Sequence, residues 1–309
     1  MALRQTSGHT CAICGITLGH RGASRRFPRF FCCPHCGGYA LVAPEPEPSY
    51  PDRYFAVPGR PGLIGRLAQP FLDYLLYLRV RKTLSLLGKD GAARVLDYGA
   101  GNGKFVAALR RRGIDAMGYD PSPAASSLAA RDGIPVSSTI PAGPFSVVTL
   151  WHSLEHSDEP AETLRLLLPR LADGAKLLIA IPNAASWEAA LAGERWFHYD
   201  YPYHRVHFTP RSITLLLESA GFRILAIDFF TPEYTVSGLA QTFLNFFLPA
   251  NALYASVSHR RQNYLRSTAI LLAISSLMLL LIAAPILIVV YLLQLLFRKS
   301  GAMVVIAQK

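Results

Sequence analysis

Two carboxylates that flank a glycine-rich segment are the residues best placed to do chemistry in this chain. Asp97 comes shortly before the run from Gly99 to Gly103, and Asp120 follows further along. Glycines let a ligand approach the backbone, and the helix expected after them offers free N–H groups. A carboxylate at Asp97 repels a pyrophosphate but suits a cofactor with ammonium and sulfonium groups, and an acid at Asp120 can accept hydrogen bonds from both ribose hydroxyls. The pair therefore favours S-adenosylmethionine over NAD.

Four histidines are the candidate general bases. His152 and His156 lie at or after the end of one predicted strand, and His204 and His207 precede a predicted helix. Methyl transfer from a sulfonium is an in-line displacement, in which an enzyme aligns nucleophile and methyl group and often removes a proton. A histidine base suits an oxygen acceptor such as a hydroxyl or phenol, whereas packing and hydrogen bonding are the alternative roles. The aromatic stretch 187–203 is expected to line an acceptor pocket, with capping of the core as the alternative.

Four of the five cysteines have the spacing of a structural zinc site. They form two Cys-x2-Cys pairs, Cys11 with Cys14 and Cys33 with Cys36. Such pairs supply four thiolates to one tetrahedral ion and leave no open position, so the predicted zinc is structural. Cys32 could replace Cys33, and His35 is an alternative ligand. The N-terminus has no apolar signal segment, so the thiols are expected in a reducing cytosol; unligated cysteines in a disordered leader are the alternative.

The elements that must position these residues alternate in type. Between about residue 63 and residue 231, strand-like and helix-like runs follow one another, which indicates a parallel α/β sheet. The predicted strands are 94–99, 116–120, 135–138, 145–152, 175–182 and 222–230. The predicted helices are 104–112, 123–131, 160–171 and 210–220. Asp97 lies near the end of the first strand, and Asp120 closes the second.

Together these motifs resemble the class I S-adenosylmethionine-dependent methyltransferases, in their ubiquinone-methyltransferase-like branch. The matching segments are Asp97-x-Gly-x-Gly-x-Gly103, Gly118-Tyr-Asp-Pro121, Leu154-Glu-His156, Ile181-Pro-Asn183 and His204-Arg-Val-His207. The resemblance implies a Rossmann-like fold with a seven-stranded sheet and S-adenosylmethionine as cofactor. The cofactor contacts that it implies are Asp97, Gly99, Ala100, Gly101, Gly103, Tyr119, Asp120, Pro121, Ser138 and Trp151.

Three positions depart from the pattern of this family. Ser146 stands where an acidic residue usually begins the fourth strand, and the third strand lacks the acid that often contacts adenine, which leaves Ser137 or Ser138. His152 occupies the place of a metal-binding acid that ubiquinone-type relatives can carry. A catalytic metal is therefore not expected.

The composition and the net charge indicate what kind of partner the chain has. Hydrophobic residues make up 51% of the chain and charged residues 17%, and the apolar excess lies in 268–297, a segment without charge that contains Pro285. A net charge of +11 fits nucleic acid or the anionic face of a membrane. Basic residues on both sides of the segment indicate that both of its ends stay cytoplasmic.

The chain accordingly divides into five parts. We expect a zinc ribbon at 1–43, a linker rich in proline and glycine at 44–62, the methyltransferase domain at 63–231, a membrane-associated insertion at 232–300 and the last strand of the sheet at 301–309. In the family this last strand inserts back into the same sheet, so the insertion must return to the side that it left. A re-entrant or monotopic hairpin near Pro285 satisfies this; a single span and a soluble dimerisation helix are the alternatives.

The expected function is methyl transfer at the cytoplasmic face of the inner membrane, to an oxygen of a lipid-like or lipid-linked acceptor. The first alternative is modification of a saccharide in cell-envelope assembly. The second is a zinc-ribbon protein that binds or modifies RNA, which the absence of an Asn-Pro-Pro-aromatic element after Leu150 makes less favoured. A non-catalytic membrane scaffold is the third.

Overall fold

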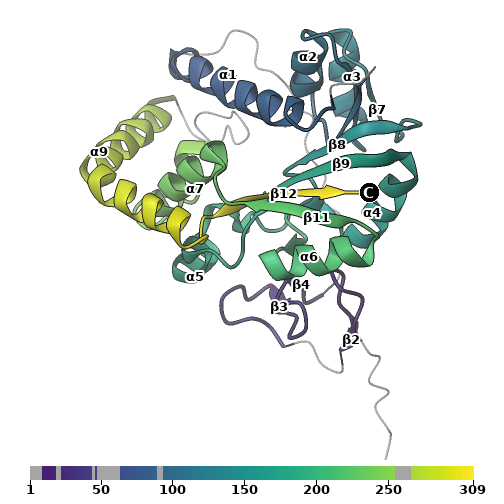
Figure 1. The fold of residues 1–309 in the computed structure, drawn as a ribbon. Coiled ribbons are helices and arrows are strands. Elements are labelled where there is room, and N and C mark those ends of the chain that lie inside the picture. Colours follow the sequence, from purple (N-terminus) through teal and green to yellow (C-terminus); the bar gives the residue numbers. More distant parts are fainter. Residues whose placement is uncertain (1–8, 19–21, 44–45, 47–62, 89–92, 255–265) are drawn as a thin grey trace, which may run out of the picture.

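A seven-stranded sheet forms the centre of the computed structural model, which describes residues 9–18, 22–43, 46, 63–88, 93–254 and 266–309. The strand order is β11-β12-β9-β8-β5-β6-β7, and β12 is antiparallel to both of its neighbours (Figure 1). The strands are β5 (Arg94–Tyr98), β6 (Asp115–Tyr119), β7 (Val136–Ser137), β8 (Phe145–Trp151), β9 (Leu171–Pro182), β11 (Arg223–Asp228) and β12 (Ala302–Gln308). This confirms the predicted α/β methyltransferase fold with a mostly parallel sheet.

Helices cover both faces of the sheet (Figure 1). One face carries α1 (Leu63–Leu84), α2 (Lys104–Arg110) and α3 (Pro123–Arg131), and the other carries α4 (Pro160–Leu167) and α6 (Pro210–Ser219). The prediction of a helix over 160–171 was too long. Residues Leu168–Arg170 form a 3-10 turn, and β9 already begins at Leu171, because Pro169 has no N–H with which to continue the α-helical hydrogen bonds.

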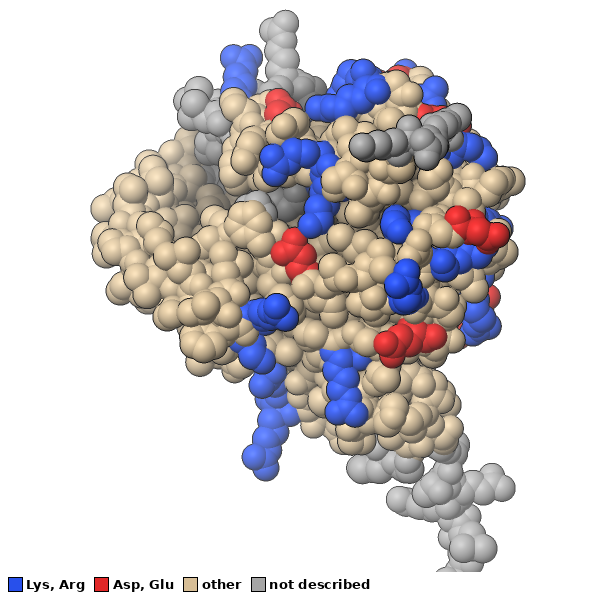
Figure 2. Space-filling model, viewed as in Figure 1, with Lys and Arg blue, Asp and Glu red and all other residues tan. Residues whose placement is uncertain are grey.

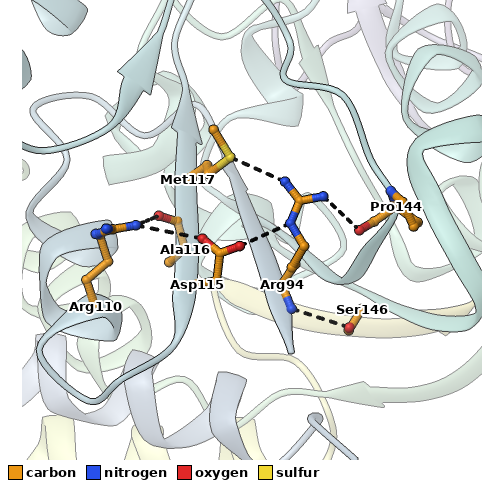
Figure 3. A network of polar contacts seen from close by, with 7 residues as sticks. All are labelled: Arg94, Arg110, Asp115, Ala116, Met117, Pro144 and Ser146. Carbon is orange, nitrogen blue, oxygen red and sulfur yellow. Dashed lines mark hydrogen bonds and ion pairs between the residues drawn. The ribbon is translucent and has the colours of Figure 1, made fainter. Parts of the chain in front are cut away.

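A polar network ties the amino ends of three strands together (Figure 3). Arg94 Nε donates to Asp115 Oδ2 at 3.1 Å, and Arg110 Nη1 lies 3.8 Å from the other oxygen of that carboxylate. The backbone N–H of Arg94 donates to the Ser146 hydroxyl at 3.4 Å. Ser146, which replaces the usual acid of the family, thus contacts β5 at the edge of the sheet opposite to the glycine-rich turn.

The N-terminal module shares a sheet with the catalytic domain. Its strands are β1 (His9–Thr10), β2 (Thr17–Leu18), β3 (Phe30–Cys32) and β4 (Tyr39–Leu41). The catalytic domain contributes β10 (Val206–His207), which pairs antiparallel with β4 so that His207 lies opposite Tyr39. The linker predicted at 44–62 lies outside the described residues, apart from residue 46.

Part of the aromatic stretch that was expected to line an acceptor pocket forms the contact with this module. Trp196 stacks on Phe27 with ring centroids 5.9 Å apart, and Tyr199 stacks on the same ring at 5.6 Å. Trp196 is 1% exposed and Phe27 is fully buried. The alternative, that these aromatic residues cap the core, is the one that the packing supports.

Among the described residues, the segment between the last two strands of the sheet contains α7 (Pro232–Leu244) and α9 (Arg266–Leu296). Asp228 at the end of β11 pairs with Val304, and Ala302 at the start of β12 pairs with Pro182 at the end of β9. The segment therefore leaves and rejoins the sheet at its carboxyl edge, the edge that also carries the glycine-rich turn. In Figure 1, α7 and α9 extend from this edge.

The apolar segment forms one helical element that contains the predicted bend site. α9 is assigned as a helix of 31 residues with Pro285 inside it. In Figure 1 the earlier and the later half of α9 lie at a wide angle to each other, as expected for a helix with an internal proline, which costs one backbone hydrogen bond and adds a steric clash. The membrane hairpin itself stays a prediction.

Candidate active site

Asp97 is a buried carboxylate at the carboxyl end of β5. It is 4% exposed and accepts a 2.7 Å hydrogen bond from Thr149 Oγ1 on the neighbouring strand β8. Burial raises its pKa to about 7, which the Thr149 hydrogen bond and the nearby charge of Arg79 partly oppose. A carboxylate that is costly to ionise in the free protein fits a site that receives a cationic group, because the bound cation would restore its charge.

The glycine-rich turn has the backbone that close approach of a ligand requires. Gly99 has a φ of 80°, and a Cβ there would lie 2.5 Å from the Cβ of Ser153. Gly103 has a φ of 76° and directly precedes α2. These left-handed conformations strongly favour glycine, so the sequence pattern follows from the geometry of the turn.

Asp120 lies just after β6 and holds the turn in place. Its Oδ2 accepts a 2.8 Å hydrogen bond from the Gly101 N–H, and its Oδ1 accepts a 3.0 Å bond from the Ser122 N–H. Each carboxylate oxygen has a second lone pair, so both can still accept from ribose hydroxyls. The residues present thus fit S-adenosylmethionine, with Asp97 for its ammonium group and Asp120 for its ribose.

The remaining predicted cofactor contacts lie along the same edge. Tyr119 ends β6, and its carbonyl accepts hydrogen bonds from the N–H groups of Gly99 and Ala100 at 2.7 and 2.9 Å. Pro121 follows Asp120 on the surface, and Ser138 is exposed just beyond β7. The last of them, Trp151, ends β8 and packs edge-on against Phe105 of α2 with centroids 5.9 Å apart.

His152 has the strongest features of a general base. It directly follows β8 with a φ of 54°, an uncommon conformation for a residue with a side chain. Its Nδ1 lies 3.0 Å from Glu155 Oε1, and its Nε2 is buried without a hydrogen-bond partner among the described residues. With the proton on Nδ1 donated to Glu155, Nε2 is the free acceptor. Burial keeps the pKa of His152 well below its usual value, so the imidazole is neutral in the free protein and Nε2 carries no proton.

His156 and His204 belong to a second grouping. Each Nδ1 lies at hydrogen-bond distance from a backbone carbonyl, that of Tyr203 at 2.9 Å and that of His198 at 2.8 Å. Glu155, His156 and His204 have ligand atoms within 4.8 Å of one another, a set that could hold a metal ion. No local pattern predicts this grouping, because His204 is distant from the other two residues along the chain.

His207, the fourth candidate base, is packed between the two parts of the protein. Its ring lies 4.6 Å from that of Phe30 and 5.6 Å from that of Trp196, and it is 1% exposed. Both ring nitrogens lack hydrogen-bond partners among the residues that the structure describes. These surroundings are those of a packing residue at the junction with the N-terminal module.

Two residues beside His152 were not predicted. Tyr234 of α7 lies over the His152 ring with centroids 3.6 Å apart. Arg79 of α1 lies between two rings, 5.3 Å from the centroid of Trp151 and 5.2 Å from that of Tyr234, and it donates a hydrogen bond to the Tyr234 hydroxyl. The segment between β11 and β12 thus contributes directly to the site, which no local pattern signals.

The four cysteines of the N-terminal module converge. The Sγ atoms of Cys11 and Cys36 are 3.9 Å apart, and those of Cys14 and Cys33 are 3.7 Å apart. A tetrahedral zinc ion with Zn–S bonds of about 2.3 Å separates neighbouring sulfurs by about 3.8 Å, so the spacing fits. The Gly38 N–H also donates to Cys36 Sγ at 3.4 Å. The exposed Cys32 belongs to β3 and lies outside this group.

Comparison with known proteins gives the family. A model of the methyltransferase domain matches residues 69–227, just over half of the chain. No curated protein matches the chain. A solved S-adenosylmethionine-dependent methyltransferase from Archaeoglobus fulgidus is 18% identical, with 80% of this chain and 100% of that chain covered and a TM-score of 0.47.

Two further solved structures are similar at the same level. The plantazolicin methyltransferase BpumL, in complex with SAH, is 17% identical, with coverage of 80% of this chain and 87% of that one and a TM-score of 0.45. The cyclopropane synthase MmaA2 from Mycobacterium tuberculosis is 15% identical, with coverage of 75% and 84% and a TM-score of 0.48. The family model extends from α1 to β11 and so includes Asp97, the glycine-rich turn and His152. The chain therefore belongs to the methyltransferase domain family and is an S-adenosylmethionine-dependent methyltransferase.

Proposed function

We propose that this methyltransferase works at a membrane surface and methylates an oxygen atom of a lipid-like or lipid-linked acceptor. The observation that carries the proposal is the position of the apolar segment. α7 and α9 leave and rejoin the sheet at the edge that holds Asp97 and His152, and Tyr234 of α7 contacts His152. An acceptor held by these helices would reach the base without crossing open water.

The residues at this edge divide the chemistry between them. Asp97 and Asp120 would hold the cofactor, which would supply an electrophilic methyl group on sulfur. His152 Nε2 accepts the proton that the acceptor hydroxyl loses when its oxygen is methylated. Glu155 keeps the other ring nitrogen protonated and stabilises the imidazolium that results. The Glu155–His156 motif supports a place for this enzyme in the ubiquinone-methyltransferase-like branch.

The outer surface of α9 is suited to lipid. Residues Ile270–Leu296 are long and apolar enough to cross a membrane, with a mean hydropathy of 2.8. Between Ile270 and Phe297, fourteen large apolar side chains are exposed. Figure 2 shows no charged side chain on the limb formed by this helix, whereas Lys and Arg are spread over the rest of the visible surface. Water-exposed apolar area of this extent marks an interaction site.

The opposite stripe of α9 is docked on the protein. Ser276, Ala283 and Gln294 are 0%, 8% and 1% exposed, and their spacing places them on one side of the helix. Near its end, Phe297 packs against Trp187 of α5 (Trp187–Ala192) with ring centroids 5.6 Å apart. A helix that crossed the bilayer would lose these contacts, so α9 lies in the plane of the cytoplasmic face of the inner membrane as a monotopic element.

The N-terminal module is a zinc ribbon with a structural role. Four thiolates at tetrahedral spacing close the coordination of the ion, and β10 ties the ribbon to the catalytic domain. The ribbon therefore stabilises the segment that precedes α6, where His204 and His207 lie. Zinc takes no part in methyl transfer.

The test is transfer of labelled methyl from S-adenosylmethionine into a membrane extract, with separation into organic and aqueous phases. Asp97→Ala is the matched inactive variant. Label in the organic phase that disappears with Asp97→Ala is the expected result. Label confined to the aqueous phase overturns the lipid acceptor and favours a saccharide, or RNA if ribonuclease removes it.

A further inference from the structure

A groove of about 340 Å³ opens between α1 and the carboxyl ends of the strands. Its inner end includes Trp151, the residue directly before His152, and Tyr234, which covers the His152 ring. The groove thus borders the candidate base from the side of α1. The other lining residues that matter for a ligand are Arg79, Arg81 and Lys82 of α1 together with Asp228 and Phe230.

The lining of the groove is positively charged. Three cations, Arg79, Arg81 and Lys82, and one carboxylate, that of Asp228, line the groove. The charge of Arg79 also acts on Asp97, whereas Lys82 Nζ lies 2.8 Å from Asp228 Oδ2, with both side chains 35% exposed. Because Arg81 and Lys82 together outnumber the Asp228 carboxylate, the lining attracts an anion, and Lys82 can exchange a protein carboxylate for one on a ligand.

The approach to the groove along α1 is apolar. Phe71, Tyr74 and Tyr77 are 51%, 55% and 45% exposed on the earlier turns of this helix. On the following turns Arg81 is exposed, and Arg79 and Lys82 are partly exposed. The groove itself continues the apolar surface through Phe230, which is 56% exposed. A ligand that is complementary to both the apolar surface of α1 and the basic groove has an anionic head group joined to a hydrocarbon tail.

We propose that this groove binds the anionic head group of the methyl acceptor, an amphiphile whose tail lies along the aromatic residues of α1. The proposal rests on the proposed function and specifies its substrate class. Arg81 and Lys82 donate charge-assisted hydrogen bonds to a phosphate or carboxylate group. Held there, the acceptor has its reacting hydroxyl on the His152 side of the Arg79–Tyr234 pair.

The test uses the full chain in neutral dodecyl maltoside micelles, with decyl phosphate as the probe and calorimetry as the readout. Arg81→Ala is expected to weaken binding about tenfold, the loss of one charge-assisted hydrogen bond. Asp228→Asn is expected to tighten binding severalfold, because it removes the competing charge and keeps the shape of the side chain. A merely structural role of Asp228 would not give this gain. Arg211→Ala, at an exposed position of α6 on the opposite face of the sheet, is the matched control.

Two further probes separate the sources of the signal. Decyl maltoside carries the same tail on a neutral head group and is expected not to bind in the groove. Inorganic phosphate is expected to compete weakly. If it binds as tightly as decyl phosphate, the proposal that the ligand is an amphiphile is refuted. If wild type, Arg81→Ala and Asp228→Asn bind decyl phosphate equally, the proposal that the groove is the binding site is refuted.

The labelling assay distinguishes this failure from that of the proposed function. If membrane lipid is labelled but the KM for it is unchanged in Arg81→Ala and Asp228→Asn, the groove is wrong and the lipid acceptor stands. If decyl phosphate binding follows the expected order but no lipid is labelled, the head-group site stands and the lipid acceptor is wrong. A higher KM in Arg81→Ala with an unchanged kcat supports both.

Discussion

Cofactor binding is expected to weaken as the pH falls through 7, because protonation of Asp97 competes with it. Burial raises the pKa of this carboxyl to about 7 in the free enzyme. A bound ammonium group favours the ionised form, so the cofactor binds the carboxylate and excludes the proton. With a pKa of about 7, the dissociation constant is expected to rise about eightfold between pH 7.5 and pH 6.

The assay is calorimetric titration with S-adenosylhomocysteine, which keeps the ammonium group, over this range of pH. Asp97→Asn preserves the shape of the side chain and removes its charge. We expect it to bind the ligand about tenfold to a hundredfold more weakly, as the loss of a charge-assisted hydrogen bond implies. Its affinity is expected to stay constant between pH 7.5 and pH 6.

Two results would refute this reasoning. One is a flat wild-type profile, which would mean that Asp97 is ionised throughout or does not contact the ammonium group. The other is an Asp97→Asn variant that keeps the wild-type slope, which would assign the titration to another residue. Glu188 is the control, because burial raises its pKa to about 8; Glu188→Gln is expected to leave the slope unchanged.

Three further predictions concern the base, the buried Glu188 of α5 and the zinc ribbon. His152→Gln is expected to lower kcat by about a hundredfold or more, with an unchanged dissociation constant for S-adenosylhomocysteine, as measured by single-turnover kinetics and calorimetry. Burial raises the pKa of Glu188 from 4.5 to about 8, so its contribution to stability falls as the pH rises from 4.5 through 8. Glu188→Gln is therefore expected to stabilise the protein by about 3 kcal/mol at pH 7. Thermal melts measure this stabilisation, and an equal rise in Tm over wild type at pH 5 and at pH 8 contradicts the prediction. Cys33→Ser is expected to abolish binding of one zinc ion per chain and to lower Tm, whereas Cys32→Ser keeps the metal; elemental analysis and melting curves decide.

The cofactor half of the candidate site was predictable because its signals are local. The turn needs glycine at Gly99 and Gly103, since their φ angles are positive, and Asp97 is recognisable by its place before them. The signal of the cysteine pairs is equally local, because each Cys-x2-Cys pair lies in a short turn with its own hydrogen bonds. In one of them the Gly37 N–H donates to the Cys33 carbonyl at 2.8 Å. The hydrophobic periods of strands and helices are local signals too, and they predicted the bounds of the strands to within a few residues.

The acceptor half of the site was decided by contacts between distant segments. Arg79 and Tyr234 meet beside His152 although they come from α1 and α7, and Glu155 approaches His204 across the same edge. The sequence by itself determined the period of each element and the turn that binds the cofactor. Which side chains gather around the base, and which stripe of α9 is buried on the protein, depended on burial against partners far along the chain. Backbone periods are encoded by neighbouring residues, but a partner across the fold exists only once the whole chain has packed.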